Sequence, residues 1–330
     1  MDPITQALMM AAASKSKQPR WVIGGVSGLL MSSDDAETWA SQSSPTSADW
    51  QAGTFSPALG KFVMVGATSG GNARAIYSED GENWSTASVP SRPGLVAVAA
   101  GRSGTFTFVD SLVAIYNGSS TRNIVSTDGE TWANGSYALG GPNNWSAVCA
   151  AKNSGYLAVR AATDSNANVY GGQATNDAWA AQTASLKGLW YDICYSPDIG
   201  LAVAVGEAGV TNRIMTSAGT TGSYESWTAR TPPSGSDGWM SICCGKGRFV
   251  GMSYAKSMVS MDGVTWSAYS MPNTASRYWQ KVTYGDGKFV ATGLNSSITT
   301  TYVAVSDDGQ TWDEVASFSG AGAPIVYGEI

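Results

Sequence analysis

A seven-residue pattern, S-x-D-G-x-T-W, recurs along this chain of 330 residues and constrains its fold more than any other feature. It appears as STDGETW at residues 126–132 and in close variants that end at Trp39, Trp84, Trp266 and Trp312. Degenerate copies, QATNDAW and TSAGTTGSYESW, end at Trp179 and Trp227. Successive copies lie 39 to 48 residues apart, and a repeat of this length predicts stacked structural units rather than independent domains.

Each repeat contains the same order of short apolar segments. A segment led by tryptophan, such as WSAVCA or WYDICY, is followed by a glycine turn and an apolar run such as KFVMVG. A third segment leads into the repeated turn, and a more polar fourth segment follows its tryptophan. Four short strands in each 40–50 residues are typical of a β-propeller blade. We predict an all-β fold over residues 20–330, a seven-bladed propeller with four strands in each blade.

The two ends of this repeating region complement each other. The first repeat lacks a leading tryptophan segment, whereas the chain ends in GAPIVYGEI, which resembles a first strand with nothing after it. We predict that Pro324–Gly328 pairs with the strand beginning at Trp21. That pairing would complete the first blade and close the ring, which removes exposed sheet edges.

The repeated turn also has a physical explanation. Its Asp side chain can accept hydrogen bonds from backbone N–H groups of the same turn, and its Gly can adopt a positive φ. Ser and Thr hydroxyl groups can brace the loop, and the Trp ring can be buried between outer strands. The first copy has Ala36 at the glycine position, where a positive φ carries a steric cost for a residue with a Cβ atom.

These turns resemble the Asp-box, and residues 20–330 resemble the Asp-box (BNR-repeat) β-propellers. That family includes sialidases, other glycosidases, sorting receptors, photosystem assembly factors and bacteriophage virion proteins. In it the boxes are structural and lie away from the ligand-binding face. The resemblance therefore implies structural roles for Asp35, Trp39, Asp80, Trp84, Asp128, Trp132, Asp262, Trp266, Asp308 and Trp312.

The composition excludes several classes of function. The net charge of −6 and the absence of a Lys/Arg run argue against a nucleic-acid partner, which requires clustered positive charge. The chain has no histidine, which excludes Ser-His and Cys-His catalysis and the usual zinc sites. Each repeated turn offers too few carboxylates for a calcium loop. We therefore expect no metal, no cofactor and no catalytic residue.

Three cysteines occupy one repeated position. Cys149, Cys194 and Cys243 each follow a leading tryptophan by four residues, in successive repeats. A metal cluster near the central channel is one interpretation. The simpler one is packing, because a crowded innermost strand favours small residues and a free cysteine behaves as a small hydrophobic side chain.

The N-terminal residues 1–19 lie outside the repeats and form a predicted helical anchor and linker. Asp2 can cap a helix and Pro3 suits its first turn, while the apolar stretch ALMMAAA is far shorter than the roughly 20 residues that span a bilayer. We expect no membrane insertion. The segment resembles the N-terminal anchors of tailed-phage structural proteins, which implies attachment to other virion proteins.

A set of cations predicts a ligand-binding face. Each member lies four residues before the Ser of a repeated turn or its counterpart, which places it on the face opposite the turns. Loops from several blades usually converge on such a face to bind ligands. A partial basic ring there could bind an anionic sugar or a carboxylate-bearing partner. The predicted ligand-binding residues are Arg74, Arg122, Arg213 and Lys256.

The leading hypothesis is a non-enzymatic, tail-associated bacteriophage virion protein, made in the host cytoplasm and present in multiple copies on the particle. Residues 1–19 would attach it, and the propeller would bind host surface glycans or neighbouring virion proteins. The alternative is a sialidase-like glycoside hydrolase. That activity needs paired carboxyl groups, and Glu207 is almost the only Glu placed on the opposite face. A further alternative is a purely architectural or assembly-factor propeller.

Overall fold

The computed structural model describes residues 17–103, 109–118, 123–135, 139, 143–152, 155–162, 168–172, 179–182, 187–207, 213–219, 226–233 and 237–330. Residues 1–16, which contain the predicted N-terminal helix, lie outside this set. The described residues form short antiparallel strands, and a 3-10 turn, η1 (Val26–Gly28), follows the first of them. No helix in this part of the chain is long and apolar enough to cross a membrane.

Five of the sheets contain four strands each. The first, in spatial order, contains β28 (Gly322–Glu329), β1 (Pro19–Gly25), β2 (Leu30–Ser33) and β3 (Ala40–Ser41). The second contains β4 (Asp49–Ser56), β5 (Lys61–Ala67), β6 (Ala73–Ser78) and β7 (Ser85–Thr86). The third contains β8 (Leu95–Ser103), β9 (Val109–Tyr116), β10 (Asn123–Ser126) and β11 (Ala133–Asn134).

Two further four-stranded sheets are formed by residues 241–319 and have the same pattern. One contains β20 (Ser241–Gly245), β21 (Arg248–Met252), β22 (Lys256–Ser260) and β23 (Ser267–Ser270). The other contains β24 (Tyr278–Gly285), β25 (Lys288–Leu294), β26 (Thr300–Ser306) and β27 (Asp313–Ser319).

The remaining strands form one eight-stranded sheet that consists of two four-strand groups. The first group contains β12 (Trp145–Ala150), β13 (Tyr156–Ala162), β14 (Val169–Gly172) and β15 (Ala180–Ala181). The second contains β16 (Gly188–Ser196), β17 (Leu201–Gly206), β18 (Ile214–Ser217) and β19 (Thr228–Arg230). The groups are joined where β13 pairs with β16, through Ala161 opposite Leu189 and Ala162 opposite Gly188.

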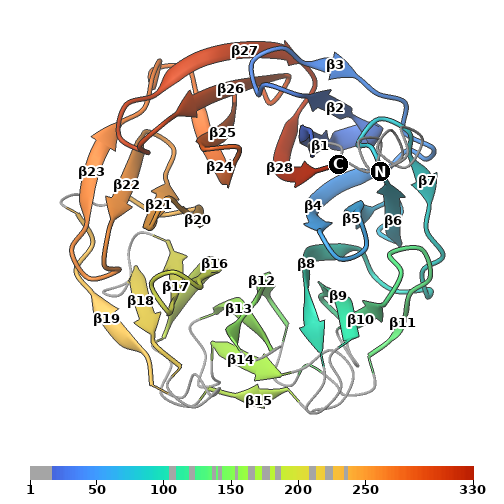
Figure 1. The fold of residues 1–330 in the computed structure, drawn as a ribbon, viewed down its shortest axis with the longest axis horizontal. Coiled ribbons are helices and arrows are strands. Elements are labelled where there is room, and N and C mark those ends of the chain that lie inside the picture. Colours follow the sequence, from blue (N-terminus) through green and yellow to red (C-terminus); the bar gives the residue numbers. More distant parts are fainter. Residues whose placement is uncertain are drawn as a thin grey trace, which may run out of the picture.

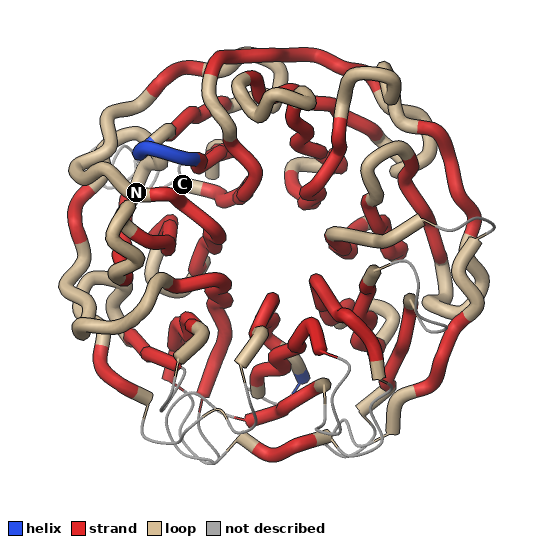
Figure 2. The backbone as a smooth tube through the Cα atoms, turned by 180° about the vertical axis from the view of Figure 1, so that it is seen from behind, coloured by secondary structure: helices blue, strands red, loops and turns tan. Residues whose placement is uncertain are grey.

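The sheets stand around a central opening, with one edge of each at the centre and the other at the rim (Figure 1). Figure 2 shows the same ring from behind. The innermost strands are β4, β8, β12, β16, β20, β24 and β28, and each contacts the next around the ring. Strand β28 contacts both β24 and β4, so the two ends of the chain meet in one sheet.

The two terminal strands pair antiparallel. Trp21 of β1 lies opposite Tyr327 of β28, within the segment 324–328 that the sequence placed there. The pairing extends to Gln18 and Ile330, which exchange backbone hydrogen bonds of 2.8 and 3.0 Å. The sheet therefore includes Gln18 and Pro19, which the sequence assigned to the linker.

The core lies between neighbouring sheets. In β5, the residues Phe62, Val63, Met64 and Val65 are all fully buried, although alternate side chains of a strand point to opposite faces. Both faces of the strand are buried because each sheet packs between two others, which explains the continuous apolar runs in the sequence. The outermost strands, such as β3, are exposed.

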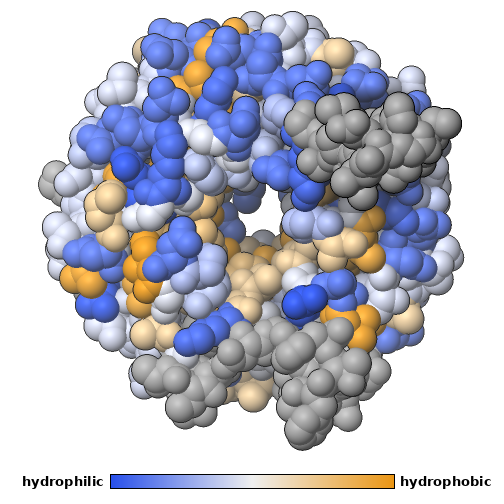
Figure 3. Space-filling model, in the orientation of Figure 1, coloured by the Kyte–Doolittle hydropathy of each residue, from blue (hydrophilic) through white to orange (hydrophobic). Residues whose placement is uncertain are grey.

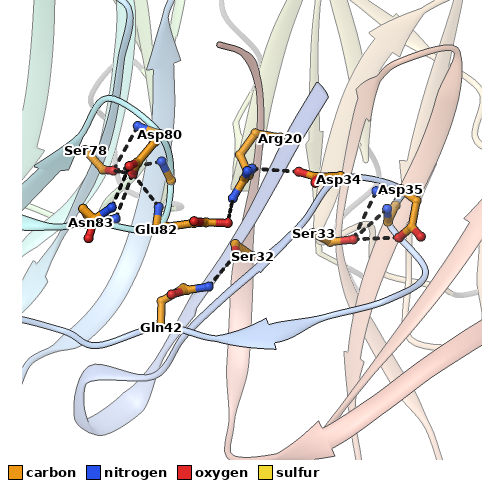
Figure 4. A network of polar contacts seen from close by, with 12 residues as sticks. Arg20, Ser32, Ser33, Asp34, Asp35, Gln42, Ser78, Asp80, Glu82 and Asn83 are labelled. Carbon is orange, nitrogen blue, oxygen red and sulfur yellow. Dashed lines mark hydrogen bonds and ion pairs between the residues drawn. The ribbon is translucent and has the colours of Figure 1, made fainter. Parts of the chain in front are cut away.

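The repeated turns have the geometry expected from their residues. In the turn shown in Figure 4, Asp80 Oδ1 accepts the N–H groups of Glu82 and Asn83, both at 2.8 Å, and Ser78 Oγ donates to it at 2.9 Å. The predicted role of the Asp side chain is thereby confirmed. The same pair of backbone hydrogen bonds, between 2.7 and 3.0 Å, is made by Asp35, Asp128, Asp262 and Asp308.

The residue after this Asp adopts a positive φ. The value is 74° at Gly81 and 66° at Ala36, so alanine adopts the same backbone conformation in the first turn despite its steric cost. The indole Nε1 of Trp84 donates to the carbonyl of Gly81 at 3.2 Å, and Trp39 donates to that of Ala36 at 3.1 Å. The backbone and hydrogen bonds of the first turn therefore match the others.

Cations from the neighbouring sheet contact several of these turns, which the sequence analysis missed. Lys61 Nζ donates to the carbonyl oxygen of Asp128 at 3.2 Å, and Lys288 Nζ donates to that of Asp35 at 3.0 Å. Arg20 lies between Asp34 of its own sheet and Glu82 of the next and pairs with both (Figure 4). The turns therefore also connect adjacent sheets.

The hydrogen bonds of the turns predict acid sensitivity. Burial opposes ionisation of Asp80, but the hydrogen bonds from Asn83, Glu82 and Ser78 outweigh it and lower the pKa of Asp80 from 3.8 to about 2. Because the folded protein favours the carboxylate, the stabilisation is present above the unfolded-state pKa and is lost as the pH falls through the folded-state pKa. The pKa values of the other four turn aspartates are lowered too.

Replacing Asp80 with Asn should test this pH dependence. The amide oxygen can still accept N–H bonds but does not titrate. We expect Asp80→Asn to lower the Tm at pH 7, with the difference from the parent shrinking between pH 4 and pH 2 as the parent's carboxylate becomes protonated. Thermal unfolding followed by circular dichroism across this range measures it. A difference that stays constant with pH would contradict the prediction.

Candidate functional site

The predicted ligand-binding cations lie at the entry of the third strand of their sheets. Arg74 is the second residue of β6, Lys256 is the first of β22, and Arg213 immediately precedes β18. The repeated turns follow the other ends of these strands. The cations therefore lie on the opposite side of the ring, which we call the loop face. Arg122 lies outside the described residues.

The structure brings two of these cations together and leaves a third apart. Arg213 Nη1 donates to the backbone carbonyl of Asp237 at 2.9 Å. Lys256 Nζ forms an ion pair with the Asp237 carboxylate at 2.8 Å. Arg74 Nη1 donates to the carbonyl of the adjacent Ala73 at 2.8 Å and is not part of this group. Asp237, which the sequence analysis did not single out, is thus the centre of the polar contacts here.

A cavity of about 310 Å³ lies beside Asp237, between the β16–β19 group and the β20–β23 sheet. We call it the loop-face hollow. Its volume is at the lower end of the range for small-molecule sites, about 300–1,000 Å³. It is lined by Tyr191, Glu207, Asp237, Gly238, Met240, Ser253, Tyr254 and Ala255.

Two residues of the hollow form a short hydrogen bond. The Tyr191 hydroxyl donates to Glu207 Oε2 at 2.5 Å. Burial, followed by this hydrogen bond and the charge of Glu207, raises the pKa of Tyr191 to about 12. Tyr191 therefore remains a protonated donor at neutral pH. Glu207 could be singled out from the sequence, but Tyr191 could not, because its place directly after the leading Trp190 is its only sequence signal.

Two carboxyl groups line the loop-face hollow, which bears on the hydrolase alternative. Glycoside cleavage requires two carboxyl groups on either side of the bond, and Glu207 and Asp237 both line this cavity. Asp237, however, is held in an ion pair with Lys256. Of the predicted arginines that the structure describes, Arg213 contacts the hollow, where it donates to the backbone carbonyl of Asp237.

The central opening forms a second cavity, of about 190 Å³, and is visible in the space-filling view (Figure 3). The carboxylate of Asp192 faces it but is already engaged. It accepts hydrogen bonds from the N–H of Ile193 at 2.9 Å, from Ser241 Oγ at 2.9 Å and from the N–H of Ile242 at 3.1 Å. Asp192 therefore connects β16 to β20 and is not free to bind a ligand.

The repeated cysteines pack among core residues of neighbouring sheets. Burial raises the pKa of Cys149, and that of Cys194 and Cys243 as well. These thiols are therefore protonated, the form in which cysteine acts as a small apolar side chain. Among the described residues, no group of three or more His, Cys, Asp or Glu side chains is arranged to hold a metal ion.

No protein-family model and no curated protein matches the sequence, but solved structures do. A protein from Lactobacillus plantarum has a TM-score of 0.66 at 13% identity, over 94% of this chain and 100% of that one. YCF48, solved with a bound D1 peptide, has a TM-score of 0.58 at 16% identity, over 84% and 90%. Apo AztD from Citrobacter koseri has a TM-score of 0.53 at 10% identity, over 95% of this chain and 98% of that one.

YCF48 and AztD are β-propeller proteins. This chain has a β-propeller fold. Its ring of sheets around a central opening is the arrangement that those similarities describe. At identities of 10–16% the likeness establishes the fold alone, because propellers carry many unrelated functions.

Proposed function

We propose that this β-propeller is a non-enzymatic, tail-associated virion protein of a bacteriophage that binds host surface glycans through the loop-face hollow. The observation that carries the binding site is the hollow itself, a cavity of about 310 Å³ lined by tyrosines and carboxylates on the face opposite the repeated turns. Aromatic rings with a few polar groups are the usual lining of a small-ligand site.

The finer architecture is part of this proposal. We infer a closed ring of seven blades of the Asp-box type. Its support is the succession of contacts among the innermost strands, the pairing of β28 with β1 and the five repeated turns with matching hydrogen bonds. Radial repetition of short sheets in a closed ring leaves only short, protected strand edges at the centre.

Removing the N-terminal segment tests the proposed attachment to the virion. Gln18 already belongs to the first sheet, so a variant lacking residues 1–16 keeps the pairing of Gln18 with Ile330. We expect this variant to keep the parent's circular dichroism spectrum and Tm but to be lost from purified particles. Quantitative mass spectrometry of particles made with each form measures incorporation. Incorporation at the parent's level would contradict the anchor proposal.

The second candidate is a glycoside hydrolase. The observation that favours it is the hydrogen bond between Tyr191 and Glu207, with Asp237 lining the same cavity. It predicts that sugars are released from host envelope material, and that Glu207→Gln abolishes the release. Mass spectrometry of the soluble fraction detects released sugars. Binding without release is the result expected for the non-enzymatic proposal.

A further inference from the structure

The loop-face hollow has an exposed aromatic side. Tyr254 lines it, and Tyr278 of β24 meets Tyr254 edge to face, with ring centroids 5.7 Å apart and an interplanar angle of 89°. Tyr254 is 48% and Tyr278 is 42% exposed, whereas Trp279, the residue after Tyr278, is fully buried. Aromatic rings kept at the surface beside a cavity indicate a contact site for a ligand.

Glu207 is the carboxylate of the hollow that can attract a charged ligand. The other carboxylate, Asp237, is paired with Lys256 at 2.8 Å. Glu207 accepts a hydrogen bond from the neutral Tyr191 hydroxyl and has no ion pair within the described residues. Among the described residues, no Lys or Arg is therefore paired with the Glu207 carboxylate.

A carboxylate without an ion-pair partner, beside tyrosine rings, favours a cation. The face of a tyrosine ring attracts a cation, and an ammonium group forms a charge-assisted hydrogen bond with a carboxylate. A ligand carboxylate, by contrast, would be repelled by Glu207. This is the reverse of the anionic ligand that the sequence predicted from Arg213 and Lys256. Lys256 pairs with the Asp237 carboxylate, and Arg213 donates to the backbone carbonyl of the same residue.

We propose that the loop-face hollow binds the free ammonium group of an amino sugar, with Glu207 as its acceptor and Tyr254 beside it. This inference rests on the proposed glycan-binding function and names the ligand class of the same site. The cavity of about 310 Å³ exceeds what the ammonium group alone would occupy, which favours a sugar ring as its carrier. The hydroxyl of Ser253 and the carboxylate of Glu207 can accept hydrogen bonds from such a ring.

A comparison of two hexamers with the same backbone tests this proposal. The probes are glucosamine hexamer, which carries free amines, and its fully N-acetylated form, which carries none. Isothermal titration calorimetry on the full chain should show binding of the free amine at least about tenfold tighter, since hydrogen bonds to charged groups are the stronger ones. The affinity should fall with added salt. Glu207→Gln should remove this preference, and Tyr254→Ala should weaken binding of the free-amine form.

Glu79→Gln is the matched control, because it makes the same change of charge at an exposed residue of a repeated turn on the opposite face. It should leave binding unchanged. Equal binding of both hexamers, unaffected by Glu207→Gln, would overturn the ammonium proposal but not glycan binding. No binding of either would overturn both. If choline or pentalysine bound as tightly as the free-amine hexamer, the hollow would recognise cations in general, and the proposal that its ligand is an amino sugar would be wrong.

Discussion

Replacing Trp279 with Ala is expected to lower the free energy of unfolding by about 3–5 kcal/mol, the usual cost of deleting a buried large aromatic side chain. Trp279 is fully buried, and its core cluster combines Val250 and Met252 of one sheet with Phe289 of the next. Its indole Nε1 donates to the Pro272 carbonyl at 3.0 Å. The change therefore leaves a cavity between two sheets and a carbonyl without its partner.

Tyr278→Ala provides the control for that experiment. Tyr278 is the adjacent residue in the same strand but is 42% exposed, so its loss should cost much less than that of Trp279. Urea denaturation of the parent and both variants, with the m-value checked for constancy, gives the comparison. Equal losses would show that Trp279 does not hold adjacent sheets together. A changed m-value would indicate that the sheets unfold separately.

The regular part of the molecule could be predicted because it is encoded locally. The spacing of the tryptophans predicts short strands in groups of four, and each S-x-D-G-x-T-W turn makes its hydrogen bonds within itself, as at Asp80. Local hydrogen bonding depends on residues a few positions apart, so sequence alone suffices. The β-propeller fold followed from the same repeat.

The contacts between sheets could not be predicted in the same way. Lys61 donates to the carbonyl of Asp128, 67 positions away. Lys256, at the start of β22, pairs with Asp237, which precedes β20 in sequence, because the two segments meet in space. The pattern placed Arg74, Arg213 and Lys256 at the start of the third strands, but it did not reveal their partners. The hollow itself is formed by loops from different repeats, and loop conformation is not set by the strand pattern.

Gly285→Ala should destabilise the seam where β24 meets the terminal strand β28. A Cβ atom at Gly285 would lie 2.0 Å from Cγ of the Tyr327 ring, far inside any normal contact. Tyr327 cannot withdraw freely, because its ring packs on Trp21 with centroids 4.8 Å apart. Overpacking of this kind typically costs about 1–3 kcal/mol and occasionally more. We expect a loss at the upper end of that range, measured by urea denaturation.

A double-mutant cycle separates this collision from other effects. In a Tyr327→Ala background the added methyl group meets no ring, so Gly285→Ala should then cost less than about 0.5 kcal/mol, and the two changes should be strongly non-additive. Gly70→Ala is the control, because Gly70, like Gly285, is not at a positive φ, and an added Cβ there would come no closer than 3.5 Å to another heavy atom. If Gly285→Ala were harmless in the parent, β28 would not be held against β24 in solution, and the ring would be open at that seam.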